Sequence, residues 1–208
     1  MTDQGEETMP IAVVNGIDLY YEQTGQGLSL IFCHEFAGDY RSWEPQVRYF
    51  SRRYRVITYN SRGYPPSEVP EDPGAYSNEI LVEDLRQLLG HLGIRQAHIA
   101  GLSMGANVAL NFGLAHPEMA RSLVVAGCGS GSAGREEALA RYGRNADDLE
   151  ARGMQAAVDY FTAAASRRVF LVKDPRGWKE FLAQLEGHSP LGSAMTLRGV
   201  QLKRKTIF

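Results

Sequence analysis

The hydrophobic positions in the first half of the chain follow two alternating patterns. Short apolar runs of strand length occur at residues 28–33, 56–59, 97–100 and 123–126. Such runs are typical of parallel strands that helices cover on both faces. The segments between them have helical spacing, most clearly at Leu81, Leu85, Leu88 and Leu92. Gly93 is placed to end that helix in a left-handed cap. Strand and helix in alternation predict an α/β fold with a doubly wound, mostly parallel sheet.

An antiparallel hairpin is predicted ahead of these strands. Two apolar runs, at residues 11–14 and 17–22, flank the dipeptide formed by Asn15 and Gly16. Asn-Gly accepts positive φ at both central positions of a tight turn. The chain therefore begins its sheet with a pair of neighbouring antiparallel strands.

The pattern changes after residue 126. A segment rich in glycine and serine at 127–134 is followed by a long region with helical spacing and no strand pattern. Two apolar stripes run through that region, one at Met154, Val158, Phe161 and Ala165, the other at Trp178, Phe181, Leu182 and Leu185. We interpret the region as a helical cap. Packing of the cap onto the body is the favoured role for any single aromatic residue, direct substrate contact is the alternative, and together they predict an apolar roof.

The candidate chemistry lies between Gly101 and Gly105, where the sequence reads Gly-Leu-Ser-Met-Gly. The motif follows the apolar run at 97–100 and opens a helical segment that ends before Pro117. In such an elbow, glycines on both sides of the serine let neighbouring backbone approach without a Cβ clash. The helix behind the serine directs its N–H groups at developing negative charge. Ser103 is therefore the predicted nucleophile of an acyl-transfer reaction.

Composition excludes several other classes of function. The chain has 208 residues, 44% hydrophobic and 22% charged, with a formal net charge of −2. It has no signature of a nucleic-acid-binding protein and no segment with the roughly 18 apolar residues of a membrane span. The polar, acidic start is not a signal peptide, so we expect a cytoplasmic protein. Cys33 and Cys128 are predicted to be free thiols, because a strand between theirs keeps them about 9 to 10 Å apart.

Three blocks of the chain resemble the α/β-hydrolase superfamily, and more narrowly its branch of small serine esterases, lipases and cofactor-free perhydrolases. The elbow is the most specific block. The second is residues 32–38, Phe-Cys-His-Glu-Phe-Ala-Gly, which is similar to the family's oxyanion loop after the third strand. The third is residues 60–67, which look like the arginine-glycine loop after the fourth strand. The resemblance spans most of residues 11–130.

The resemblance implies a role for each matching position. Ser103 would be the nucleophile, and the backbone N–H groups of Met104 and Phe36 would bind the oxyanion. Met104 is also expected on physical grounds, since the N–H groups of a helix's first turn have no partner within the helix. A serine at the elbow argues against the dehalogenase and epoxide-hydrolase chemistries of the same fold. No cofactor and no metal are implied.

The loops that surround the elbow depart from the family pattern in two places. Glu35 stands where the family usually has glycine, and Asn60 where it usually has aspartate. Glu35 is expected to be a solvated carboxylate, or alternatively to pair with Arg62 and brace the oxyanion loop. His34 is expected to bond loop backbone.

The resemblance places the acid and the histidine of the triad on two further strands beyond the cap. The sequence contains no such segment before Phe208. We therefore expect a C-terminally truncated member that lacks the last two strands, the final helix and both triad residues. Among the five histidines, His188 in the cap is the one with a path toward Ser103, and we do not expect it to act as the base.

These observations predict a division of the chain into four parts: a flexible N-terminal tail at 1–10, a core with six strands at 11–130, a helical cap at 131–200 and a truncated connection at 201–208. The run at 123–126 would be an open apolar edge of the sheet. We expect such an edge to aggregate, to pair with a second copy or a complementing chain, or to belong to a longer parent protein.

The predicted function is that of a serine hydrolase that acts on small acyl or aryl esters through an acyl-Ser103 intermediate. The substrate would be a small apolar ester or lactone, and the missing acid and histidine would cripple this chain. Two alternatives stay open: a non-enzymatic module that binds a small ligand, and an inactive fragment of a longer hydrolase.

Overall fold

The structure is a computed structural model, and it describes residues 10–129 and 134–205. Its sheet has six strands: β1 (Ile11–Val14), β2 (Ile17–Thr24), β3 (Leu28–Cys33), β4 (Tyr54–Tyr59), β5 (Ala97–Leu102) and β6 (Ala120–Ala126). They lie in the order β1-β2-β4-β3-β5-β6. The pairs within β4-β3-β5-β6 are parallel, whereas β1 and β2 pair antiparallel with each other and β2 with β4. The predicted mostly parallel sheet is confirmed.

The turn between β1 and β2 has the predicted geometry. Asn15 has φ of 48° and Gly16 has φ of 77°, as a tight hairpin turn with right-handed strand twist requires. The Asn15 side chain also donates to Asp84 Oδ1 at 2.7 Å. The hairpin is therefore anchored to the helix that carries Asp84.

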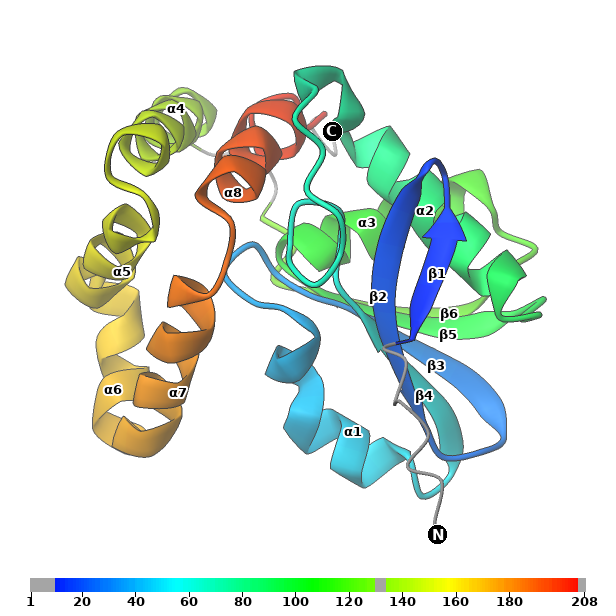
Figure 1. Ribbon diagram of the computed structural model, residues 1–208. Helices are drawn as coiled ribbons and strands as arrows, with labels where there is room; N and C mark the ends of the chain where they lie inside the picture. The colour runs from blue at the N-terminus through cyan, green and yellow to red at the C-terminus, as the bar shows by residue number, and fades with distance from the viewer. Residues whose placement is uncertain (1–9, 130–133, 206–208) are drawn as a thin grey trace, which may run out of the picture.

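Helices cover the two faces of the sheet (Figure 1). One face packs against the 3₁₀ turn η1 (Tyr40–Trp43) and α1 (Glu44–Phe50). The other face packs against α2 (Asn78–His91) and α3 (Met104–Ala115). Another 3₁₀ turn, η2 (Pro73–Ala75), precedes α2. Leu81, Leu85 and Leu88 of the predicted stripe are buried in α2, whereas Leu92 follows the helix and is partly buried. Gly93 comes next with φ of 67°.

A group of helices forms the cap at the left of Figure 1. It consists of α4 (Arg135–Arg152), α5 (Met154–Ala163), the 3₁₀ turn η3 (Ala165–Arg167), α6 (Arg168–Lys173), α7 (Pro175–Glu186), α8 (Pro190–Thr196) and the π-helical turn η4 (Leu197–Gln201). The described part of the cap contains no strand. Residues from both predicted stripes, among them Met154, Phe161, Phe181 and Leu185, share one apolar cluster with Ala37 of the body.

Two glycines bring the cap into backbone contact with the body. A Cβ added to Gly192 of α8 would lie 1.9 Å from the carbonyl oxygen of Gly63. A Cβ added to Gly199 of η4 would lie 2.2 Å from the carbonyl oxygen of Tyr76. Neither position has room for a side chain, so α8 and η4 rest directly on the loops that follow β4.

The strand β6 lies at the edge of the sheet and exposes apolar side chains. Leu123, Val124 and Val125 are 37%, 56% and 38% exposed. The open edge was predicted, and it carries unpaired backbone groups. Cys33 and Cys128 are free thiols on either side of β5, also as predicted. Among the described helices, none is long and apolar enough to cross a membrane.

A buried ion pair joins the loop after β4 to α2. Arg62 donates from Nη2 to Asp84 Oδ1 at 2.6 Å and from Nε to Oδ2 at 2.7 Å. Both side chains are at most 4% exposed. Burial raises the pKa of Asp84, although the Arg62 hydrogen bonds act against that rise. Each charge of such a pair depends on the other for its solvation.

Removal of the Asp84 charge should therefore be costly. We predict that Asp84→Asn lowers the free energy of unfolding by about 3 to 5 kcal/mol, because it leaves the Arg62 guanidinium buried without a counter-charge. Urea unfolding measures the change. The matched control is Glu83→Gln on the same helix, whose partner Arg86 is 40% exposed and which should cost less than about 1 kcal/mol. Equal losses in the two variants would contradict the account.

Candidate active site

Ser103 occupies a strained turn between β5 and α3. Its φ of 53° and ψ of −107° are unusual for a residue with a side chain. A Cβ added to Gly101 would lie 2.1 Å from the carbonyl oxygen of Gly105, and one added to Gly105 would lie 2.1 Å from that of Cys33. The Ser103 N–H donates to Ala126 O at 2.9 Å. The turn therefore has the predicted close backbone contacts and is tied to β6.

The helix α3 begins directly behind Ser103. Its first hydrogen bond runs from Asn107 N–H to Ser103 O at 3.1 Å, and no side chain caps the helix. The N–H of Met104 therefore has no helical acceptor and lies at the positive end of the helix dipole. A developing negative charge beside Ser103 would find this donor in place.

His34 stabilises the loop after β3 through hydrogen bonds to backbone groups. The Ser61 N–H donates to His34 Nε2 at 3.0 Å, so the ring proton is on Nδ1 and is donated to Glu35 O at 2.8 Å. Burial lowers the pKa of His34 to about 4. His34 is thus a neutral ring that bonds loop backbone on both sides.

Phe36, the second expected oxyanion donor, lies farther along this loop. Its carbonyl oxygen accepts a hydrogen bond from the Tyr64 hydroxyl at 3.0 Å. The Gly38 N–H donates to Glu35 O at 3.1 Å and closes a tight turn. These bonds fix the loop backbone on either side of Phe36, and Phe36 itself lines a cavity that also contains Ser103.

Both expectations for Glu35 are wrong. Its carboxyl is neither solvated nor paired with Arg62, which is bonded to Asp84 instead. Glu35 Oε2 is buried and has no hydrogen-bond partner among the described residues. The carboxyl group packs against Gly38, and burial raises its pKa. The cap supplies the nearby positive charge of Arg167, and the sequence of the loop alone carried no sign of that contact.

Asn60 shows why an amide suits a position where the family usually has aspartate. It is completely buried. Its Nδ2 donates to Pro65 O at 2.7 Å and to Tyr64 O at 3.2 Å, while its Oδ1 accepts from Tyr40 N–H at 2.7 Å. A carboxylate would offer no donor to the two carbonyl groups.

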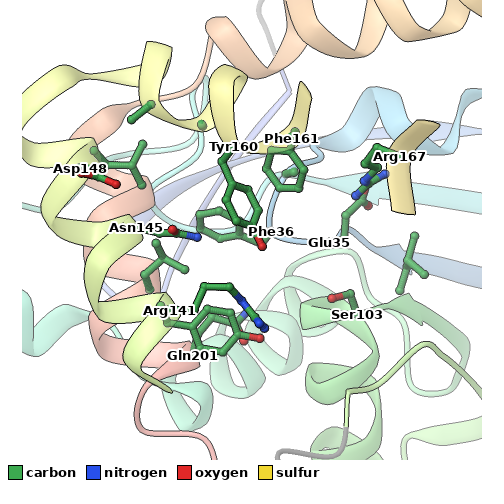
Figure 2. A pocket seen from close by; sticks show the side chains of 17 residues that line it. Glu35, Phe36, Ser103, Arg141, Asn145, Asp148, Tyr160, Phe161, Arg167 and Gln201 are labelled. Atoms are coloured by element: carbon green, nitrogen blue, oxygen red, sulfur yellow. The ribbon is translucent and has the colours of Figure 1, made fainter. Parts of the chain in front are cut away.

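Ser103 opens into a cavity of about 390 Å³ between the oxyanion loop and the cap (Figure 2). That volume is within the range of small-molecule sites. Aromatic rings of Phe36, Tyr160 and Phe161 line part of it. The polar part of the lining comes from Glu35, Arg141, Asn145, Asp148, Arg167 and Gln201, and aliphatic side chains complete it. The expected apolar roof is therefore wrong in part, because the cap supplies two arginines and two amides as well as aromatic rings.

The polar wall comes mainly from one face of α4. Arg141, Asn145 and Asp148 follow one another at helical spacing and all line the cavity. The spacing is visible in the sequence, but the same pattern is found on any solvated helix face. The partners of the cap aromatics are clear only in the structure: Phe161 lines the cavity, while Phe181 and Trp178 pack behind it.

None of the five histidines lines the cavity. His188, between α7 and α8, is buried against Tyr64, and its Nε2 lies 3.4 Å from Asp39 Oδ2. Hydrogen bonds from His188 and Arg41 lower the pKa of Asp39 despite its burial. This buried pair joins the cap to the oxyanion loop and leaves Ser103 without an imidazole base among residues 10–129 and 134–205. The same residues contain no cluster of three metal-binding side chains.

The strain at Ser103 predicts an unusual order of stability. Ser103→Gly removes the Cβ that opposes positive φ, whereas Ser103→Ala keeps it. We expect the glycine variant to be about 1 kcal/mol more stable than the alanine variant, since relief of strain outweighs the added flexibility of glycine in the unfolded chain. Urea unfolding of the two variants checks this. An alanine variant as stable as the glycine variant, or more so, would contradict a strained elbow.

The neutral state of His34 predicts acid sensitivity. The unfolded chain takes up a proton on His34 near pH 6.5, which the folded chain does not until about pH 4. This histidine should therefore cost about 3 kcal/mol of stability as the pH falls across that window. Urea unfolding of the parent chain and of His34→Asn should show the steeper pH slope in the parent. The same slope in His34→Asn and the parent would refute the assignment.

The chain is similar to two curated proteins in sequence and to a solved structure in fold. Mus musculus epoxide hydrolase 3 is 28% identical over 121 residues, which are 57% of this chain and 33% of that protein. The 3-oxoadipate enol-lactonase 1 of Acinetobacter baylyi is 35% identical over 98 residues, 47% of this chain and 36% of that protein. A thermophilic esterase from Thermogutta terrifontis has the same fold, with a TM-score of 0.81 and 24% identity over 96% of this chain and 74% of the other.

The matched stretch is about a third of the length of each of these two curated relatives. Within this chain, the family model described as alpha/beta hydrolase fold matches residues 29–174, which include the oxyanion loop, the elbow and much of the cap. This match covers more than half of the chain. The chain therefore belongs to the α/β hydrolase fold family.

Proposed function

We propose that Ser103 is the nucleophile of a hydrolase that acts on small carboxylic esters or lactones. The observation that carries the proposal is the position of Ser103 at a positive φ, at the start of α3 and at the wall of a cavity. The Ser103 hydroxyl can attack the acyl carbon of a substrate bound in the cavity, and the next residue, Met104, supplies a backbone N–H for the oxyanion. Phe36 N–H is the second oxyanion donor of the proposal.

The reaction proceeds in two steps. Ser103 Oγ bonds to the carbonyl carbon, its proton passes to a base, and the alcohol departs with a proton. Water then attacks the acyl-serine and releases the acid. Each oxyanion donor in a related serine enzyme is worth about 2.7 to 4 kcal/mol. Backbone donors alone therefore give a partial rate enhancement.

The described residues place no histidine near Ser103, and this limits the rate. Loss of the histidine from a complete serine triad lowers kcat by about 10⁶-fold. We propose that this chain acylates slowly and turns over poorly, because efficient hydrolysis needs an imidazole base beside Ser103 that the described residues do not supply. The related epoxide hydrolases are named for epoxides, which have no acyl carbonyl. The related enol-lactonase is named for a lactone, which has the acyl carbonyl that the proposed reaction requires.

A binding module is the second candidate. The absence of a histidine from the cavity wall favours it, because a cavity without a base still holds a ligand. The strained serine turn favours the enzyme, since a simple binding site has no need of such a turn.

The open edge of the sheet supports a further part of the proposal. We propose that β6 pairs with a strand of another chain, a second copy or a complementing one, because its exposed Leu123, Val124 and Val125 leave an apolar edge uncovered. Sedimentation or light scattering should show an oligomer or a concentration-dependent association, which Val124→Lys weakens.

A fluorophosphonate probe tests the nucleophile. We predict that prolonged incubation labels one site per folded chain, that peptide mapping finds the label on Ser103, and that Ser103→Ala removes it. Ser122→Ala, at an exposed position of β6, should keep the label and serves as the control. Incubation with p-nitrophenyl acetate should likewise leave an acetyl group on Ser103.

The contrary outcomes separate the candidates. A cooperatively melting sample that stays unlabelled would support the binding module over the hydrolase. A chain that melts without cooperativity and aggregates would support an inactive fragment. Equal labelling of the parent and Ser103→Ala would place the reactive group elsewhere and refute the assignment.

A further inference from the structure

The cavity next to Ser103 contains a positive charge without a counter-charge. Arg141 projects from α4 into the cavity (Figure 2), and its Nε is buried without a hydrogen-bond partner among the described residues. The described residues form no ion pair with it. Its guanidinium carbon lies 5.5 Å from the centre of the Tyr142 ring. A guanidinium group stays charged at any ordinary pH, so this part of the wall is permanently cationic.

The acidic residues of the same cavity do not neutralise Arg141. Asp148 lies seven residues farther along α4, which is about 10 Å of helix. Glu35 is on the oxyanion loop and forms no ion pair with Arg141 among the described residues. The arginine that acts on Glu35 is Arg167.

Arg167 has more partners than Arg141, whose guanidinium lies over one ring. The Arg167 guanidinium lies over the rings of Phe161 and Phe181, with distances of 5.2 Å and 5.3 Å to the ring centres. These contacts, together with the nearby Glu35, hold the group at the cap side of the cavity. Arg141 is therefore the arginine that is left for a ligand.

Gln201 adds a neutral donor to the same wall. It is 4% exposed and lines the cavity. Arg204, which has donors only, approaches the Gln201 side chain at 2.5 Å, so the atom that faces it must be the amide oxygen. Arg204 itself is fixed by a second bond to Gly129 O at 2.9 Å. The amide NH₂ of Gln201 is therefore turned away from Arg204, and no described residue accepts a hydrogen bond from it.

We propose that Arg141 and Gln201 form an anion subsite for the carboxylate of a substrate whose ester or lactone carbonyl lies at Ser103. A planar fork of guanidinium donors matches a carboxylate, and the amide supplies one more donor. The aromatic residues Phe36, Tyr160 and Phe161 line the same cavity, and they suit the short carbon chain between the two ends of such a molecule. The substrate class is thus a half-ester of a small dicarboxylic acid or a carboxylated lactone. The ester or lactone end of this substrate rests on the proposed function, but the anion subsite does not.

Binding to the full chain with Ser103→Ala tests the subsite apart from the nucleophile. Isothermal titration compares monomethyl glutarate with dimethyl glutarate, which differ in one free carboxylate. We expect the half-ester to bind at least about tenfold more tightly, because only its free carboxylate can form charge-assisted hydrogen bonds with Arg141. Adding Arg141→Gln should reduce this preference to less than about twofold.

Arg144→Gln is the matched control. It removes the same charge from the same helix, but Arg144 is exposed and does not line the cavity, so the preference should remain. If Arg141→Gln fails to fold by circular dichroism, Arg141→Lys replaces it, and the loss of the planar fork should leave an intermediate preference. The proposal is overturned if the diester binds as tightly as the half-ester, if the half-ester does not bind, or if the preference survives the loss of Arg141. Fluorophosphonate labelling of Ser103 is an independent result, so failure of one proposal does not imply failure of the other.

Discussion

The site depends on one backbone contact, the approach of α3 to the end of β3. Gly105 lies so close to the carbonyl oxygens of Cys33 and His34 that a Cβ would be 2.1 Å and 2.7 Å from them. Because the oxyanion loop begins at these two residues, the contact brings the start of α3 and that loop together. The sharp turn that leads into α3 has Ser103 at a positive φ. A larger residue at position 105 would separate the proposed donors of Met104 and Phe36 from each other.

The parts around this contact are linked by buried polar groups. His34, Tyr64 and Asn60 bond the backbone of the two loops that follow β3 and β4. The contact between Asp39 and His188 extends the same network into the cap. Hydrogen bonds among buried groups stiffen the two loops, and loss of a member leaves an unpaired buried group. Together with the close packing of Gly192 and Gly199 on the loops after β4, the Asp39 contact with His188 joins the cap to the oxyanion loop.

The sequence predicted the elements with local signals. Asn15 and Gly16 determine their own turn, and the leucines of α2 reveal the buried face of that helix. The elbow glycines indicate that other backbone comes close to them, but the sequence does not show which backbone that is. Side-chain partners across the fold could not be predicted. Pairing of Glu35 with Arg62 was one expectation, yet Arg62 bonds to Asp84 on α2 and Glu35 lies near Arg167 of the cap. Arg141 was missed because a cationic helix position is usually solvated, and only the packing of α4 on α8 and η4 places it in a cavity.

A crystal structure of the chain after reaction with a fluorophosphonate tests the nucleophile and both oxyanion donors most directly. The phosphorus atom should be bonded to Ser103 Oγ, with one phosphonyl oxygen within hydrogen-bond distance of the backbone N–H groups of both Met104 and Phe36, roughly 2.7 to 3.1 Å. An adduct on another residue, or a phosphonyl oxygen that points away from both donors into solvent, would contradict these assignments.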